Sequence, residues 1–238
     1  MQPLLYRTLS IHPRFVQSEF PRLSLGAVAK LSTSQPDALR AHTRHICFVD
    51  FRPDDVAPAA DFLALCPVTV DLAFIDTPWW VAYPDMLGTL PLKRFSFCPC
   101  SLDRELRPAP FDGTRAIFSE VTHLDIVDWE FAHWSDWSGL AQMPKLTHLS
   151  TAHPMSQAVV LGILEHCELL EVLVFRHRAQ WRLDEDHKSA VVTEDPRFVM
   201  LVVEDRLAEW ESGARGGGDY WATASAIVKK RRSGGDRG

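Results

Sequence analysis

The 238-residue chain lacks the sequence features that mark several common functional classes. No stretch approaches the roughly 18 uncharged apolar residues that a membrane-spanning helix requires. The first twenty residues lack the charged and apolar segments of a secretory signal peptide. Basic residues do not dominate, because 25 Lys and Arg stand against 31 Asp and Glu. These absences predict a cytoplasmic and/or nuclear protein with no membrane or nucleic-acid partner.

Cysteine is also scarce, and its spacing is incomplete for a metal site. The chain has five cysteines, and an odd number argues against a complete disulfide framework. Cys98 and Cys100 are separated by one proline, but no second close pair completes the four ligands of a structural zinc site. We therefore favour buried thiols over zinc, and we expect no metal and no cofactor.

A run of three glycines at 216–218 lacks the context of a nucleotide-binding loop. No Gly-Lys-Ser/Thr follows it, and no GxGxxG spacing fits. Asp219 is instead predicted to cap an amphipathic helix whose cationic end, at 229–232, opposes the helix dipole. A nuclear-import signal is the alternative reading of those four residues. We predict that residues 205–232 form a helical cap over the last apolar repeat and that 233–238 form a disordered tail.

What the chain does contain is a recurring six-residue pattern, apolar-x-x-apolar-x-apolar. Its copies follow one another at intervals of 23 to 29 residues over most of the chain. A period of this length is typical of repeat architectures, in which one repeat cannot bury its apolar face without neighbours. The copies lie at residues 6–11, 43–48, 69–74, 92–97, 121–126, 146–151, 170–175 and 198–203.

The segments between these copies have helical or loop-like patterns. Residues 156–167 place apolar side chains at helical spacing, and 54–65 form a shorter case that Asp54 or Asp55 could cap. Prolines make 103–113 loop-like. Strands that alternate with helices are parallel and joined by crossovers. We therefore predict an α/β fold in residues 1–204: a curved, leucine-rich-repeat-like solenoid with about eight parallel strands alternating with helices.

Several passages carry a family resemblance. Residues 143–149 and 165–173 look like the helix-to-strand entry of leucine-rich repeats, and 5–9 looks like the first strand after an F-box. The tail at 195–232 is similar to the ending of a fungal group of such proteins. The chain thus resembles irregular leucine-rich-repeat proteins, and among them the substrate-recognition region of basidiomycete-type F-box proteins.

This resemblance implies a function without catalysis. In an F-box subunit of a cullin–RING ubiquitin ligase, the repeats recognise a target while other subunits transfer ubiquitin. No F-box is apparent before Leu5, so we expect no adaptor binding. The resulting hypothesis is a non-enzymatic interaction domain for a protein or peptide target. The alternative is a stand-alone repeat scaffold or regulatory binding module with no ligase role.

The candidate contact residues follow from the strand pattern. Side chains alternate across a strand, so the non-core positions of neighbouring repeats form columns on one shared, predicted concave, face. The predicted partner-binding residues on this face are Arg94, His123, Asp125 and His148. A metal or proton-transfer site at the two histidines is less favoured, because no His-Glu-x-x-His motif is present. The two columns predicted to carry these residues are His45, Asp71, Arg94, His123, His148, Val172 and Met200, and Cys47, Ala73, Ser96, Asp125, Ser150, Val174 and Val202.

Tryptophan is the other unusual feature, with eight in the chain. Trp129, Trp134 and Trp137 follow one predicted strand, and loops after parallel strands lie along one rim where functional residues gather. Because tryptophan is enriched in binding hot spots, this segment is the best candidate contact loop. Packing against the helical side of the repeats is the favoured role for the tryptophans in general.

Overall fold

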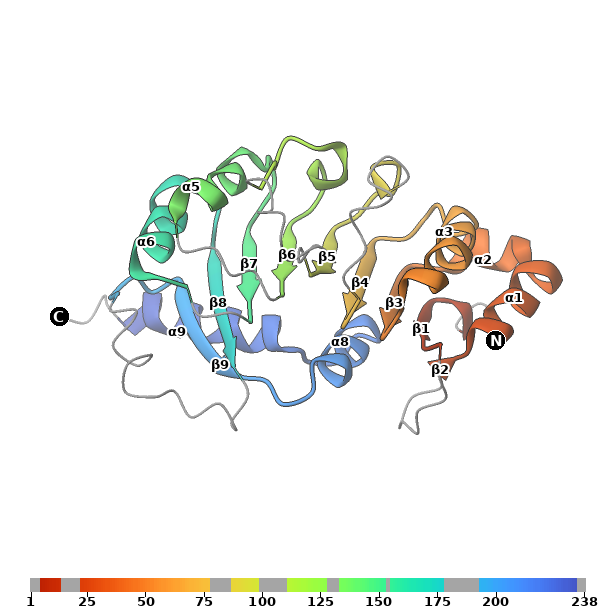
Figure 1. The fold of residues 1–238 in the computed structure, drawn as a ribbon. Helices are drawn as coiled ribbons and strands as arrows, with labels where there is room; N and C mark the ends of the chain where they lie inside the picture. The colour runs from red at the N-terminus through yellow and green to blue at the C-terminus, as the bar shows by residue number, and fades with distance from the viewer. Residues whose placement is uncertain are drawn as a thin grey trace.

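The computed structural model describes residues 5–13, 22–77, 87–98, 111–127, 133–152, 155–177 and 193–234. These residues form an α/β fold built on one sheet of nine parallel strands (Figure 1), which confirms the predicted class and strand direction. The order across the sheet is β2-β1-β3-β4-β5-β6-β7-β8-β9. The strands are β1 (Thr8–Ile11), β2 (Arg22–Leu23), β3 (His45–Val49), β4 (Asp71–Ile75), β5 (Arg94–Phe97), β6 (His123–Ile126), β7 (His148–Thr151), β8 (Val172–His177) and β9 (Phe198–Val202).

Helices cover both faces of this sheet. Helices α1, α2, α3, α5 and α6 lie on one side, and α8 and α9 lie on the other (Figure 1). Within the described ranges, no helix is long and apolar enough to cross a membrane. The helices are α1 (Leu25–Ser34), α2 (Pro36–His42), α3 (Val56–Ala64), α5 (Trp134–Trp137), α6 (Gln157–His166), α8 (Arg206–Ala214) and α9 (Tyr220–Gly234).

Helices α3 and α6 were expected from the sequence between the strands. Helix α6 follows Ser156, whose hydroxyl accepts a hydrogen bond from the Val159 amide, as an N-cap does. Helix α3 also forms, and Asp55 occupies its N-cap position as predicted, but without a side-chain capping bond. The Asp55 side chain makes no capping bond to α3, because it accepts from the Arg52 amide and closes the turn before the helix.

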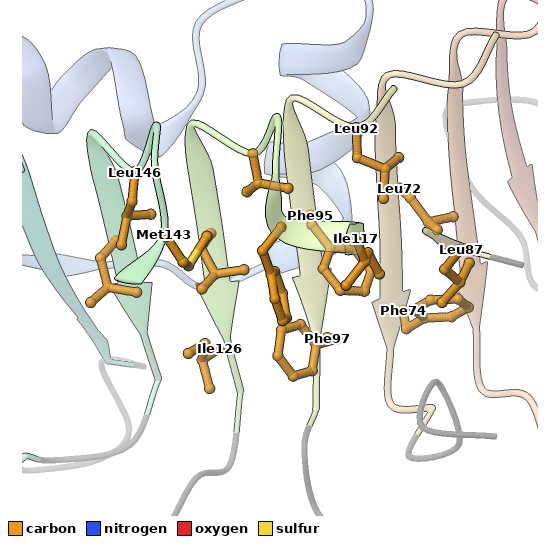
Figure 2. Close-up of a cluster of buried hydrophobic side chains, with 14 of the residues drawn as sticks. Leu72, Phe74, Leu87, Leu92, Phe95, Phe97, Ile117, Ile126, Met143 and Leu146 are labelled. Atoms are coloured by element: carbon orange, nitrogen blue, oxygen red, sulfur yellow. The ribbon is translucent and has the colours of Figure 1, made fainter. Parts of the chain in front are cut away.

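The first face of the sheet, under α1, α2, α3, α5 and α6, is formed by the apolar positions of the repeat. The middle residues of neighbouring repeats are aligned partners from β1 to β8, as the spacing predicts. Figure 2 shows Phe74, Phe95 and Phe97 on the same side of their strands, within the buried cluster. The aligned middle residues are Leu9, Ile46, Leu72, Phe95, Leu124, Leu149 and Leu173.

The last strand departs from the predicted register. Leu173 is aligned with Phe198 rather than with Leu201, a difference of three residues. An odd shift moves every side chain of a strand to the other face. Met200 is therefore aligned with Phe175 on the first face, so Met200 and Val202 do not belong to the predicted columns. The reason is that Phe198 fills the core position beside Leu173.

The second face of the sheet is covered by residues 206–234, which comprise α8, a glycine turn and α9 and are called the strap below. In α8, Leu207 and Trp210 pack against β3 and β4. In α9, Tyr220 and Trp221 pack against β8 and β9. The predicted C-terminal helix therefore forms, but it lies along the sheet face, and it continues through Gly234, two residues beyond the predicted end. Residues 235–238 of the predicted disordered tail lie outside the described residues.

Candidate functional site

The structure brings four of the predicted contact residues together on the second face. Arg94, His123 and His148 are aligned partners on β5, β6 and β7, and Asp125 is aligned with Ser96 in the neighbouring column. The two columns are thus confirmed as far as β8. The strap lies over them, however, and the side chains face α8 and α9 of the same chain.

Asp125 is the centre of a buried ionic cluster. It is 4 % exposed, and its carboxylate bonds to the Arg176 guanidinium, lies 3.3 Å from Arg206 Nε and accepts from the Ser96 hydroxyl at 2.6 Å. Burial alone would raise the pKa of Asp125, but the two guanidiniums and these hydrogen bonds outweigh it and lower the pKa. The carboxylate is therefore ionised, and its oxygen atoms are already paired with groups of the same chain.

The cluster joins the strap to the sheet from both sides. Arg176 on β8 donates from Nε to the Ser150 hydroxyl at 2.7 Å. Its guanidinium carbon lies 5.0 Å from the centre of the Tyr220 ring in α9, within the range of a cation–π contact. Arg206 in α8 donates to the Ser96 hydroxyl at 2.6 Å. Asp125 thus forms ion pairs with two arginines, one from the sheet and one from the strap.

His123 and His148 form a stacked pair beneath α9. Their ring centres are 4.1 Å apart with planes inclined by 9°, and the Trp221 ring meets both edge-on. Burial lowers the pKa of His123 to about 3, with further lowering by His148 and Arg94. The pKa of His148 is also lowered, mainly by burial. The two rings are therefore neutral at pH 7, and Trp221 of the strap packs against both of them.

Further polar contacts tie the strap to the sheet. Arg94 Nη1 donates to Asp219 Oδ2 at 2.8 Å, and Trp210 Nε1 donates to Asp71 Oδ1 at 3.0 Å. Asp219 also accepts from the Ala222 amide, which confirms its predicted role as the N-cap of α9. The cavity left between strap and sheet is about 30 Å³. Such a volume holds about two water molecules, so a metabolite does not fit there in this conformation.

The glycine run serves the turn between α8 and α9. Gly216 has φ of 87°, a left-handed conformation that glycine adopts without strain. At Gly213, a Cβ atom would come within 2.4 Å of Asp219 Oδ2. These requirements explain glycine at both positions without a phosphate ligand.

The predicted tryptophan loop is only partly described. Trp137 is 1 % exposed and belongs to the core of the first face. Trp134 is half-buried and stacks on His166 of α6 at 5.2 Å between ring centres. Trp129 lies outside the described residues. For Trp134 and Trp137 the structure favours packing, the general role preferred for the tryptophans, over a free contact surface.

The cysteines and the other titratable groups form no metal site in the part of the chain that the structure describes. Cys47, Cys66, Cys98 and Cys167 are buried, and Cys100 lies outside the described ranges. Burial raises the pKa of Cys47 and of Cys66, which makes these thiols poor nucleophiles.

Sequence reasoning missed the residues of the strap that complete this site. Arg206, Trp210 and Trp221 come from a tail that was assigned to the end of the sheet. The available signal was the apolar face of the tail helix, which predicts that something covers it but not which surface. Comparison with protein-family models, with curated proteins and with solved structures finds no match.

Proposed function

We propose that this protein is a non-enzymatic protein-interaction domain, similar to the substrate-recognition part of an F-box subunit of a ubiquitin ligase. We further propose that its sheet is the inner layer of a curved, leucine-rich-repeat-like solenoid. The observation that carries the proposal is that one sequence repeat supplies one strand, with equivalent repeat positions side by side from β1 to β8. Such a fold grows by stacking and presents an extended surface, which suits a macromolecular target.

The state of the polar residues argues against catalysis at the second face. Asp125 is held between two arginines, and His123 and His148 are stacked on each other. A general acid or base needs access to a substrate proton, but the adjoining cavity holds about two waters. The polar residues of the second face therefore fit a role in positioning the strap.

Quantitative affinity capture with the full chain tests the proposal. We expect a protein that binds saturably and is displaced by an excess of untagged chain. A fusion that carries an F-box upstream of Leu5 is expected to capture the ligase adaptor and cullin as well. If no protein binds saturably and the purified chain turns over a small molecule, the proposal is wrong.

The alternative, a stand-alone scaffold with no ligase role, predicts the same saturable partner but a different fate for it. A ligase reconstituted with the F-box fusion should ubiquitinate the partner if the domain recognises substrates. A partner that binds with the same affinity but is not ubiquitinated would favour the scaffold.

A further inference from the structure

The contact between α9 and the sheet depends on two histidines whose rings stack. The rings of His123 and His148 are 4.1 Å apart, and Trp221 of α9 packs edge-on against both. A single positive charge on either ring would lie beside a neutral neighbour, but two charges at this separation would repel each other. The surface on which α9 packs therefore includes two imidazole rings that can become positively charged.

The hydrogen bonds leave a definite place for an added proton. The Thr147 hydroxyl donates to the Thr122 carbonyl, so it accepts from His148 Nδ1 at 2.8 Å. The Thr122 hydroxyl likewise donates to the Lys93 carbonyl and accepts from His123 Nδ1 at 2.9 Å. In the neutral His123 ring the proton is thus on Nδ1, and Nε2 is the atom that gains a proton on acidification. His148 Nε2 lies 3.2 Å from Ser225 Oγ of α9, and that hydroxyl donates to the Trp221 carbonyl, so an Nε2 proton on His148 would have this hydroxyl as its acceptor.

The charged groups around the pair do not offset two added charges. Arg94, on the β5 side, lowers the pKa of both rings. Asp219 at the start of α9 and Glu171 before β8 act in the opposite direction on His148, but Asp219 already pairs with Arg94. The cavity beside His123 is also lined by Arg206 and Glu209 of α8.

The direction of the pH effect follows from these contacts. With the strap closed, the pKa values of both histidines lie below the usual 6.5. In the released state the rings are exposed and regain ordinary values, so the released state binds protons more tightly. Closure is thus fully favoured above about pH 6.5, and it weakens as the pH falls from there towards the lowered values.

We propose that the His123–His148 pair is a proton-sensitive latch, which holds α9 on the second face at neutral pH and releases it on acidification. Release would expose the part of the polar columns that α9 covers, including His123 and His148. This use of the exposed face for a partner rests on the proposed function, whereas the latch itself does not.

Hydrogen–deuterium exchange of the full chain at pH 7.5 and 5.0, corrected for intrinsic exchange rates, tests the latch. We expect protection of α9 to fall by roughly tenfold or more at pH 5.0, given the depth of the shift in pKa, while protection of α6 on the other face stays constant. The double variant His123→Gln/His148→Gln should abolish the fall. His166→Gln, which replaces a partly exposed histidine of α6, should retain it.

Three outcomes would overturn the latch: unchanged protection of α9, simultaneous loss in α9 and α6, or an undiminished fall in the double variant. If the double variant does not fold, His148→Gln alone should reduce the fall, and the comparison of α9 with α6 in the unmodified chain still decides. Release of α9 at pH 5.0 with no saturable partner at either pH would support the latch and contradict the proposed function.

Discussion

The two faces of the sheet are both buried, but they are buried by different chemistry. The first face is covered by helices that lie between successive strands, and its contacts are apolar, as between Phe74 and Phe95. The second face is covered by the C-terminal strap, and its contacts include the ions of Asp125 and Arg176 and the stacked ring of His123. Each repeat thus builds its own share of the first face, while the second face depends on one distant segment.

This difference affects how precisely each face fixes the position of the segment that covers it. Apolar burial is non-directional and scales with area, so the first face tolerates exchange of one apolar side chain for another of similar volume. A buried ion stabilises a fold only when its partners are correctly placed. The second face therefore accepts the strap in one position, set by Asp125 and by the Arg94–Asp219 pair.

The largest effect is expected on the first face, from Phe95→Ala. Phe95 is 1 % exposed, and its ring centre is 4.9 Å from that of Phe97, so truncation leaves a cavity in the middle of the sheet. We expect the free energy of unfolding to fall by about 4 kcal/mol in chemical denaturation. Leu161→Ala, at a leucine of α6 that is 45 % exposed, is the control and should cost much less. Equal losses for the two variants would contradict the assignment of the core.

A somewhat smaller loss is expected on the second face, from Asp125→Asn. This change leaves Arg176 and Arg206 buried without their shared carboxylate, which costs about 3 kcal/mol in the free energy of unfolding. Exchange protection of α8 and α9 should fall more than that of α6. Glu120→Gln is the matched control, because Glu120 is an exposed carboxylate that also bridges two cations. An Asp125 variant as stable as this control would mean that the strap is not held by the ionic cluster.

The smallest of these effects is expected in the turn of the strap, from Gly216→Ala. The left-handed φ of Gly216 makes a Cβ unfavourable even though no atom lies within 4 Å of it. We expect a loss of about 1 kcal/mol in thermal or chemical denaturation. Gly218→Ala is the control, since its site is equally open and its backbone is not left-handed. If both substitutions are neutral, the turn does not constrain the strap.

Much of the first face was predictable, because apolar core positions alternate with non-core positions along each predicted strand. The spacing of apolar positions placed the strands and aligned β1 to β8 correctly. It did not align β9, because all six residues at 198–203 are apolar and alternation cannot select a register. It also missed β2, since Arg22 and Leu23 are too few to define a period.

For the second face, the sequence pattern predicted which residues share the surface but not what covers them. Alternation correctly placed Arg94, His123 and Asp125 on one surface. It could not reveal that Asp125 is buried, because the partner Arg206 belongs to another segment and no local pattern relates the two. An amphipathic tail helix predicts burial of its apolar side, and only the folded chain identifies the surface that provides it.

Native-state alkylation of the cysteines tests most directly whether the strap covers the second face. Cys47 lies on that face, 0 % exposed beneath Leu207 and Trp210, whereas Cys66 and Cys167 lie in the core of the first face. With iodoacetamide at pH 7.5 and site-by-site mass spectrometry, we expect all three to stay unmodified over a period that labels the unfolded chain completely. Rapid labelling of Cys47 while Cys66 and Cys167 remain protected would contradict the account.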